Sequence, residues 1–529
     1  MEYALKKKTG SYYTCEKITE FMARSIINNS STRVLEPSFG DGIFIEAIQN
    51  RFKKIGNSTA EIYGVEIQKE IYENFCKRNA IKDVICDDFM KIKNLPEMDA
   101  VIGNPPFVRI RNLDKSSKEN ALNASLEMGI DMQTSGSLWM PFILHSCKFL
   151  KKDGSLSFVL PYEITYVKYA FPLWLFLKRN FSNITIVRIQ KDFFPDVDVE
   201  TVILTATGFG GDTNIVNYCL YKSTDDLFDN NHANTNIINI NDILSGERPF
   251  VMALLTEKQR KLIAVLKENN FLTPINKLCK FKIGYVSAHK EYFHPTDQTI
   301  RAYNLPNTNL TPIITNMKEI NKSKAGLYLN EGCFSQKLYL PKSITEYDQT
   351  YIDYGLSQNV HKRYKCKQRK PWYVTPDVNI PDMVLTVFGN IPKLLINSGK
   401  YNVTNSLLCG YIKKDAISAE NIASRWYNSL TLLSIELQVH SLGGGVLVLV
   451  PGEADTIMVL SELPNTINKD FSNQINRLLV DGKTEEAYQL GDSYIFNNSA
   501  TLGENDLKII REALDVLRTW RMPERRKTM

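Results

Sequence analysis

The sequence predicts an α/β domain with a mostly parallel, doubly wound sheet, followed by a mixed α+β domain. Short apolar strands alternate with amphipathic helical segments up to about residue 210. Polar residues stand directly after four successive predicted strands, where an open α/β sheet binds its ligands. The composition then changes at residues 212–241, which are rich in Asn and Asp. We therefore expect a first domain at residues 1–245 and a second at 246–529, ending in a helical segment.

Apolar periodicity and capping residues predict the individual elements. In the first domain helices are expected at residues 16–27, 42–52, 68–78, 138–150 and 171–179. Thr14 stands at the N-cap position of the first helix, and Gly154 is expected to end the fourth. Strands are expected at residues 33–36, 61–65, 83–86, 100–102, 156–160, 184–189 and 201–207. In the second domain helices are expected at residues 256–268, 470–480 and 505–520.

Composition narrows the class of protein. The chain has 529 residues, 43% of them hydrophobic, and a net charge of +6, which is compatible with a polyanionic partner without requiring one. Nine cysteines without a Cys-x-x-Cys pair favour a reducing compartment and argue against a zinc site, so no metal is expected. Residues 1–8 lack a signal-peptide pattern, and no segment reaches the roughly 20 apolar residues of a membrane span. We expect a cytoplasmic protein that binds no membrane.

The first predicted strand leads into a loop suited to a ligand. The strand ends in Glu36, and the loop that follows contains Gly40 and Gly42 before a helix begins. The two glycines allow a ligand to approach the backbone closely, and the helix N-terminus adds the positive end of a dipole. The pattern does not match the Gly-x-Gly-x-x-Gly dinucleotide fingerprint, so a lone Gly-x-Gly is a weak indication.

Acidic residues follow the next two predicted strands. Glu66 ends the second strand, where an acid usually binds the hydroxyls of a ribose. Asp88 and Phe89 follow the third strand, and a carboxylate beside an aromatic ring could bind the amino group of an adenine and flank its ring. For Glu66 alone, a solvated strand end would be the favoured interpretation. The carboxyl ends of parallel strands meet at one edge of a sheet, so these groups are expected to converge on one crevice.

The fourth predicted strand leads into Asn104-Pro105-Pro106-Phe107, around which the rest of the domain is organised. Neither proline has an N–H group and both have a fixed φ, so Asn104 and the Pro105 carbonyl are held rigidly. An amide oxygen beside a carbonyl suits an NH2 group, which offers two hydrogens, and Phe107 offers a face on which a planar base could stack. Asn-Pro also starts ordinary turns, which is the alternative for this motif taken alone.

The second domain contains a strongly basic segment. Six of the nine residues from Lys362 to Lys370 are basic, and Trp372 and Tyr373 follow them. Cations interleaved with aromatic rings bind phosphates and stack on bases. A solvated charged face is the alternative, which the two aromatic residues make less favourable.

Taken in order, these motifs resemble the TaqI-like (gamma-class) DNA adenine-N6 methyltransferases of restriction–modification and bacterial epigenetic type. The resemblance covers residues 10 to 208. The matching motifs are Tyr13-Thr14 (the N-terminal motif), Glu36 to Gly42 (the methionine-end cofactor loop), Glu66 (the ribose-binding acid), Asp88-Phe89 (the adenine end), Asn104 to Phe107 (the catalytic tetrad) and Phe194 in Phe-Phe-Pro. Two positions depart from the pattern, because the family often has tyrosine at 107 and proline at 15, where this chain has Phe107 and Cys15.

The resemblance implies a Rossmann-like class I methyltransferase domain with a seven-stranded sheet, S-adenosyl-L-methionine as cofactor, and a DNA target recognition domain. It implies cofactor binding by Tyr13, Thr14, Glu36, Pro37, Ser38, Gly40, Gly42, Glu66, Ile67, Asp88, Phe89, Asn104 and Pro106. It implies a catalytic set of Asn104, Pro105, Pro106 and Phe107, with Phe107 and Phe194 stacking on an extruded base. In the second domain, double-stranded DNA is expected to contact Lys362, Arg363, Lys365, Lys367, Arg369, Lys370, Trp372 and Tyr373.

The expected function is therefore methyl transfer to the N6 amino group of adenine in a short double-stranded DNA motif. RNA adenine and protein-glutamine methyltransferases use the same Asn-Pro-Pro-aromatic motif, and the long basic second half argues against the protein-modifying alternative. A catalytically dead DNA-binding homologue is a further alternative. A combined restriction enzyme is disfavoured, because we find no convincing Pro-Asp…Glu-x-Lys nuclease motif. A separate cognate restriction endonuclease is a partner that such a system allows.

Overall fold

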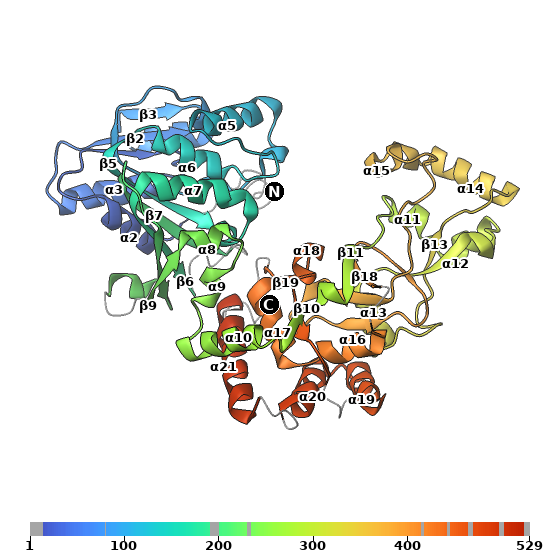
Figure 1. The fold of residues 1–529 in the computed structure, drawn as a ribbon. Helices are drawn as coiled ribbons and strands as arrows, with labels where there is room; N and C mark the ends of the chain where they lie inside the picture. The colour runs from blue at the N-terminus through green and yellow to red at the C-terminus, as the bar shows by residue number, and fades with distance from the viewer. Residues whose placement is uncertain are drawn as a thin grey trace. The chain divides into compact units, whose positions relative to one another are not determined.

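The computed structural model describes residues 14–79, 81–190, 200–229, 234–413, 417–441, 445–463, 469–496 and 502–522. The chain divides into two compact units (Figure 1). The first runs to Leu254 and takes in Met522, and the second spans Leu255–Arg521. The predicted boundary at residues 245 and 246 lies between α8 (Ile240–Leu244) and α9 (Pro249–Met252) of the first unit.

The first unit is built on one nine-stranded sheet with the order β3-β2-β1-β4-β5-β7-β6-β8-β9. β1 (Arg33–Glu36) pairs in parallel with β2 (Glu61–Glu66) on one side and with β4 (Met98–Gly103) on the other. The chain therefore changes its direction of winding at β1, and such a switch point opens a crevice outside the carboxyl ends of the strands. The other strands are β3 (Asp83–Cys86), β5 (Leu150–Pro161), β6 (Phe181–Ile189), β7 (Thr201–Phe209), β8 (Ile215–Tyr221) and β9 (Asn234–Asn239).

The predicted count of seven strands is wrong. The additional strands are β8 and β9, which come from the Asn- and Asp-rich residues 212–241, where no strand was expected. β8 pairs in parallel with β6, and β9 forms the edge by pairing antiparallel with β8. Val216, Tyr218 and Leu220 are buried while Ile215, Asn217 and Cys219 are not, which is the period of a half-buried strand, and Tyr221 at its end is buried as well.

Helices pack on the sheet through their apolar faces. Ile18 and Met22 of α2 and Phe44 and Ile48 of α3 are fully buried in one cluster with side chains of β1, β4, β5 and β7. The helices of the first unit, besides α8 and α9, are α2 (Glu16–Ile26), α3 (Ile43–Lys54), α4 (Lys69–Arg78), α5 (Lys115–Glu127), α6 (Trp139–Cys147) and α7 (Phe171–Asn180). No helix among the described residues is both long and apolar enough to cross a membrane.

Two expected helix ends are wrong. Cys15 rather than Thr14 is the N-cap of α2, and no side chain caps that end. α6 ends at Cys147 rather than at residue 150, because β5 already begins at Leu150. Gly154 therefore lies inside β5 and caps no helix, at a register shift in the pairing with β4, and Asp153 beside it has a φ of 63°.

The second unit combines small sheets with helices. Its largest sheet has the order β11-β18-β14-β16, and a three-stranded sheet has the order β13-β12-β17. The strands are β10 (Leu272–Pro274), β11 (Cys279–Ile283), β12 (Leu310–Ile314), β13 (Lys337–Tyr339), β14 (Met383–Thr386), β15 (Phe388–Gly389), β16 (Leu394–Ile396), β17 (Asn402–Val403), β18 (Leu407–Ile412), β19 (Leu447–Val448) and β20 (Met458–Leu460). One of its cores is rich in aromatic rings, and in it Tyr292 stacks on Tyr351 with ring centroids 4.7 Å apart.

The three helices expected in the second unit are present as α10 (Glu257–Glu268), α19 (Lys469–Val480) and α21 (Glu504–Arg521). Thr256 and Gln259 cap α10 reciprocally. The remaining helices, which the sequence did not predict, are α11 (Lys290–Phe293), α12 (Asp297–Ala302), α13 (Met317–Ser323), α14 (Glu346–Ser357), α15 (Tyr364–Lys367), α16 (Ala419–Trp426), α17 (Ser429–Gln438), α18 (Pro451–Ala454) and α20 (Thr484–Phe496).

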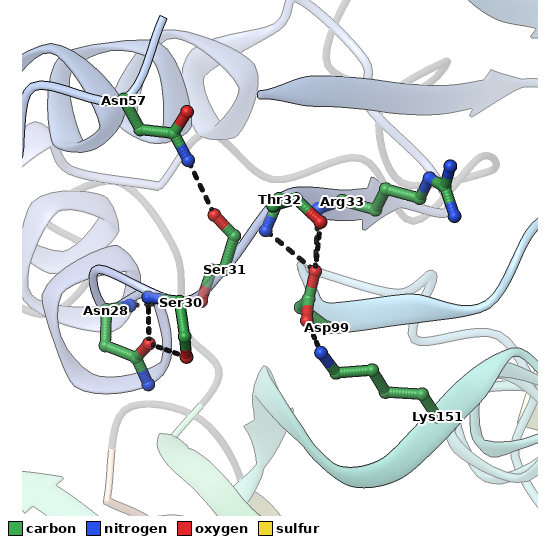
Figure 2. A network of polar contacts seen from close by, with 8 residues as sticks. All are labelled: Asn28, Ser30, Ser31, Thr32, Arg33, Asn57, Asp99 and Lys151. Carbon is green, nitrogen blue, oxygen red and sulfur yellow. Dashed lines mark hydrogen bonds and ion pairs between the residues drawn. The ribbon is translucent and has the colours of Figure 1, made fainter. Parts of the chain in front are cut away.

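A buried carboxylate fastens the amino ends of three central strands (Figure 2). Asp99, near the start of β4, accepts hydrogen bonds from the backbone of Thr32 at 2.7 Å and of Arg33 at 2.8 Å, where β1 begins. Its other oxygen pairs with Lys151 of β5. Burial alone would raise the pKa of Asp99, but the Lys151 ammonium and the donors from Thr32 and Arg33 outweigh it, so the pKa lies below its ordinary value. One side chain thus aligns β1, β4 and β5.

We expect Asp99→Asn to lower the free energy of unfolding by about 2 kcal/mol at pH 7, because a buried charged acceptor with several donors is removed. Urea denaturation measures this. Glu97→Gln removes an exposed carboxylate two residues away and should change stability by less than about 0.5 kcal/mol.

The difference between wild type and Asp99→Asn should also depend on pH. The folded-state pKa lies below the ordinary 3.8, so the stabilisation is present above 3.8 and is lost as the pH falls through the folded value. Equal stabilities at pH 7, or a difference that grows in acid, would contradict this role for Asp99.

Candidate active site

The sheet order places four predicted groups at one edge. Glu36 ends β1, Glu66 ends β2, and Asp88 and Asn104 follow β3 and β4, which are all neighbouring parallel strands. Hydrogen bonds connect the ends of β1, β2 and β4 through the loop that follows β1. The Gly40 N–H group donates to Glu66 at 3.0 Å, and the Ser38 hydroxyl donates to the Asn104 carbonyl at 3.3 Å. Three of the four strand ends are therefore bonded to one another, and Asp88 follows the next strand along the same edge.

The two glycines of the first loop differ in what surrounds them. Both have positive φ, 55° at Gly40 and 92° at Gly42, where other residues would be strained. A side chain at Gly42 would also collide with the buried Phe75 ring. Around Gly40 a Cβ atom would meet no other atom within 4 Å. Gly42 thus permits the packing of the loop, whereas Gly40 leaves open space in front of the backbone.

Glu36 and Glu66 are two buried carboxyls in this loop region. Glu36 is 1% exposed, and its Oε2 atom has no hydrogen-bond partner among the residues that the structure describes. Burial, together with the charges of Asp41 and Glu66, raises the pKa of Glu36 well above its ordinary value. Glu66 accepts from the backbone N–H groups of Gly40 and Gln68, and burial raises its pKa despite these bonds. A buried carboxylate oxygen without a donor indicates a cation or donor that a ligand supplies.

The third strand end presents a polar group but no aromatic face. Asp88 accepts from the backbone of Met90 at 3.0 Å and from the Asn120 side chain of α5 at 3.1 Å. The Phe89 ring is 2% exposed and packs in the core, with its centroid 4.8 Å from that of His145. It therefore offers no face to a ligand in this structure. The exposed apolar side chain at this edge is Ile67, which is 61% exposed.

Asn104 is held from two sides. Its side-chain amide nitrogen donates to the Thr14 hydroxyl at 3.3 Å, and its backbone carbonyl oxygen accepts a hydrogen bond from the Ser38 hydroxyl. Thr14 is 3% exposed, so the residue expected to cap α2 contacts the candidate catalytic asparagine instead. Pro37 is buried and lies beside Gly103, where a Cβ atom would come within 3.5 Å of the proline ring. The backbone before Asn104 is thus closely packed.

Of the two aromatic residues expected to stack on a base, the structure describes Phe107 and not Phe194. Phe107 is half-buried and packs against the core cluster under α2 and α3. Pro105 is buried and Pro106 is half-buried. Tyr13 and Phe194 lie outside the described residues, so the structure does not test their predicted roles.

The basic segment of the second unit separates into exposed and anchoring side chains. Lys362, Arg363, Lys365, Lys367 and Lys370 are exposed. The Arg369 guanidinium donates instead to the carbonyls of Val286 and Ser287 and lies over the Phe293 ring at 5.2 Å.

The two aromatic residues of this segment serve its packing. Trp372 packs into the aromatic core, 5.3 Å from Tyr292, and half-buried Tyr373 contacts Trp372 edge-on at 5.8 Å. The exposed aromatic ring of the segment is that of Tyr364, at 73%, which was not among the residues predicted to contact DNA.

Two further side chains near the carboxyl ends of the strands in the first unit, those of Asn120 and Glu163, were not predicted. Asn120 orients Asp88, and Glu163 follows β5 and accepts a hydrogen bond from Arg109. Both lack a local motif, because their partners are distant in the chain. Among the residues that the structure describes, no three His, Cys, Asp or Glu side chains gather as metal ligands would.

Two family models match the chain. The model described as "Eco57I restriction-modification methylase" matches residues 43–194. The model described as "Type II methyltransferase M.Eco57I, C-terminal domain" matches residues 247–496. The first match contains the Asn104 loop, and the second contains the basic segment.

Similar proteins are type II methyltransferases. The type II methyltransferase M.AccI of Acinetobacter calcoaceticus is 23% identical over 442 residues, which are 79% of this chain and 78% of that protein. The type II methyltransferase M.HincII of Haemophilus influenzae is 28% identical over 195 residues, 36% of each chain. These matches support a restriction–modification methyltransferase and do not favour the RNA, protein or catalytically dead alternatives. The narrower TaqI-like gamma class stays a prediction.

Solved structures share the fold. The type IIL restriction-modification enzyme MmeI, solved in complex with DNA, aligns with a TM-score of 0.52 at 12% identity and covers 95% of this chain and 72% of its own. DrdV, solved as a DNA complex, aligns with a TM-score of 0.50 at 11% identity, over 90% of this chain and 58% of its own.

A methyltransferase of this kind implies S-adenosylmethionine as methyl donor, and the residues of the crevice fit it. Its amino-acid end carries an ammonium group, which matches the buried Glu36 oxygen that has no donor. Its ribose hydroxyls are the donors that Glu66 could accept at the end of β2. The open space in front of Gly40 allows close approach of the ligand to the backbone.

We expect Glu36→Gln to weaken S-adenosylmethionine binding by about 10- to 100-fold at pH 8, because a charge-assisted hydrogen bond is removed. Isothermal titration calorimetry measures this without requiring turnover. Glu46→Gln, which removes an exposed carboxylate on α3, serves as the matched control and should bind like wild type.

Glu36→Gln and Glu46→Gln should also differ in how the stabilisation by S-adenosylmethionine depends on pH. The folded-state pKa of Glu36 is raised above 4.5. The stability of the ligand-free protein therefore falls as the pH rises through the raised value. The ammonium group of a bound ligand would offset that loss. The increase in melting temperature caused by S-adenosylmethionine should therefore grow with pH in wild type and in Glu46→Gln, and less in Glu36→Gln. Identical pH profiles in all three would contradict the assignment of Glu36.

Proposed function

We propose that this chain is a site-specific DNA methyltransferase of the TaqI-like class, which transfers a methyl group from S-adenosylmethionine to the N6 amino group of adenine in a short double-stranded motif. One observation carries the proposal. The Asn104-Pro105-Pro106-Phe107 loop lies at the switch point of the sheet, bonded through Ser38 to the loop that follows Glu36 and contains Gly40. The type II methyltransferase relatives and the two DNA-bound structures support DNA as the substrate.

The crevice residues would bind and orient the cofactor. S-adenosylmethionine supplies an activated methyl group when it is bound. We assign its ammonium group to Glu36, its ribose hydroxyls to Glu66 and the amino group of its adenine to Asp88, which Asn120 orients. Ile67 would supply the apolar surface for the adenine ring. The remaining contacts would come from Tyr13, Thr14, Pro37, Ser38, Gly40, Gly42 and Pro106.

Asn104 and Pro105 would act on the target base. The lone pair of an aromatic amino group is delocalised into the ring, so the nitrogen is a poor nucleophile. Hydrogen bonds from this group to the Asn104 amide oxygen and the Pro105 carbonyl favour a pyramidal nitrogen and stabilise the positive charge that develops during transfer. The amide nitrogen donates to the Thr14 hydroxyl, and this bond would orient the amide so that its oxygen can accept from the base. Correct placement of the base contributes the rest of the acceleration.

The target base must leave the duplex to reach this site. Phe107, partly buried against the core under α2, would stack on one face of the extruded base. Phe194 is proposed for the second stacking contact on the strength of its Phe-Phe-Pro motif alone.

The second unit would hold the DNA. The exposed side chains Lys362, Arg363, Lys365, Lys367 and Lys370 are proposed to bind phosphates, because their charges are accessible to a DNA backbone. Arg369 and Trp372 would support the segment rather than contact DNA, since both are engaged in the fold. Tyr373 is a secondary candidate, and exposed Tyr364 is added as a stacking residue. A separate cognate endonuclease stays a prediction.

We expect the wild-type protein to place N6-methyladenine at one short motif of unmethylated plasmid DNA, and Asn104→Ala to lose at least about 100-fold of this activity because a transition-state acceptor is removed. Modification-sensitive single-molecule sequencing measures both. S-adenosylmethionine affinity, measured separately, shows that the variant is folded. Tight cofactor binding by wild type with no mark on DNA would refute the proposed function.

The exposed lysines should determine the salt dependence of DNA binding. Replacing Lys362, Lys365 and Lys367 by alanine should reduce the slope of log affinity against log salt by about 0.9 for each phosphate that the variant no longer neutralises. Alanine at Lys258, Lys261 and Lys267, exposed on α10, is the matched control and should leave the slope unchanged. Arg369→Ala should lower the melting temperature with little change in slope. An unchanged slope in the first triple variant would remove this segment from the DNA interface.

A further inference from the structure

A largely buried carboxylate, Glu163, is bound to Arg109 just beyond the candidate catalytic loop and has no role in the proposed reaction. It belongs to the 3₁₀ turn Tyr162–Thr165, which directly follows β5. β5 pairs in parallel with β4, with Phe158 opposite Gly103, so Glu163 and Asn104 follow neighbouring strands at the same edge of the sheet. The Glu163 side chain is 19% exposed.

Three donors from separate segments bind this carboxylate. The Arg109 guanidinium donates to Oε2 at 2.9 Å. The Trp139 indole N–H group at the start of α6 donates to Oε1 at 3.4 Å, and the Tyr169 hydroxyl donates to the same oxygen. The Arg109 guanidinium also lies over the Tyr169 ring, 5.2 Å from its centroid. Both oxygens of Glu163 are therefore committed to fixed partners.

Arg109 is two residues beyond Phe107, and backbone hydrogen bonds hold the residues on either side of Arg109. The Leu138 N–H group donates to the Val108 carbonyl at 2.8 Å, and the Ile110 N–H group donates to the Gly136 carbonyl at 3.0 Å. Residues 108–110, which form the short backbone strip after Phe107, are thus bound through their backbone to the segment before α6. The Arg109 side chain binds them to Glu163.

Two further arginines hold the segment of Glu163. Arg188 of β6 lies over the Tyr162 ring at 4.0 Å, and Arg248 lies over the Tyr166 ring at 4.7 Å. The segment that receives Arg109 is therefore itself clamped by arginines from two other parts of the first unit. A polar network of this kind specifies one arrangement of its members, because each group loses a partner if any other member moves.

We infer that Arg109 and Glu163 are positioning residues for the target base: their ion pair sets the place of Phe107 against the Asn104 and Pro105 acceptors. The inference rests on the proposed function, since a base must enter this site for the placement to matter. Neither side chain is assigned a contact with the reacting atoms. Their effect would reach the reaction through the short backbone strip that joins Arg109 to Phe107.

The test compares Glu163→Gln and Arg109→Lys with wild type, once the methylated motif is known. Glu163→Gln keeps the shape of the side chain and removes its charge, whereas Arg109→Lys keeps the charge and removes the planar fork of donors. We expect kcat at saturating cofactor and DNA to fall by about 10- to 100-fold in Glu163→Gln and by less in Arg109→Lys. Cofactor affinity should stay within about twofold of wild type, because the Glu36 loop is untouched.

A spectroscopic signature separates positioning from folding. DNA with 2-aminopurine at the target adenine should become more fluorescent in complexes with Glu163→Gln than with wild type, because an extruded base that is poorly stacked on Phe107 is less quenched. Phe107→Ala provides the reference for absent stacking. Glu119→Gln, which removes an exposed carboxylate of α5, is the matched control and should behave like wild type.

Each outcome decides the inference. Unchanged kcat and unchanged 2-aminopurine fluorescence in both variants would overturn it. A fall in melting temperature with unchanged kcat per cofactor-binding molecule would also overturn it, because the pair would then serve folding alone. Absence of DNA methylation by wild type would instead refute the proposed function, and with it the premise of this inference.

Discussion

Parallel pairing of β1 with both β2 and β4 determines where every candidate ligand group of the first unit lies. Because parallel strands end at the same edge, Glu36, Glu66 and Asn104 meet although they are far apart in the sequence. At the opposite edge, Asp99 holds the starts of β1, β4 and β5 in line. The geometry of the site therefore depends on polar contacts at the end of the sheet that is remote from it.

Much of the fold and of the candidate site could be predicted from local pattern. Strand ends carrying an acid or an Asn-Pro-Pro motif are visible in the sequence, because they need only a short apolar run followed by a polar residue. The sequence could not show that Phe89 and Trp372 are buried in cores, since burial depends on partners such as His145 and Tyr292 from distant segments. The hydrogen bond of Thr14 to Asn104 was not predictable for the same reason, because the two residues are 90 positions apart.

The candidate site combines two ways of treating buried charge. Glu163 has donors on both oxygens, so its charge is satisfied within the protein. Glu36 is still more deeply buried, but one of its oxygens has no donor in the described part of the chain, and its pKa is raised. A satisfied carboxylate holds structure in place, whereas an unsatisfied one retains binding energy for a ligand. The two glutamates can be told apart on this ground without reference to any relative.

The basic segment divides its tasks between different side chains. Arg369 and Trp372 attach it to the fold, while the lysines and Tyr364 are exposed. The exposed residues can then be replaced without disturbing the attachment. Such a surface can acquire a new ligand preference by successive single substitutions, each of which leaves a folded protein. Within this short stretch of chain, some positions can therefore change to alter recognition while others keep the segment attached to the fold.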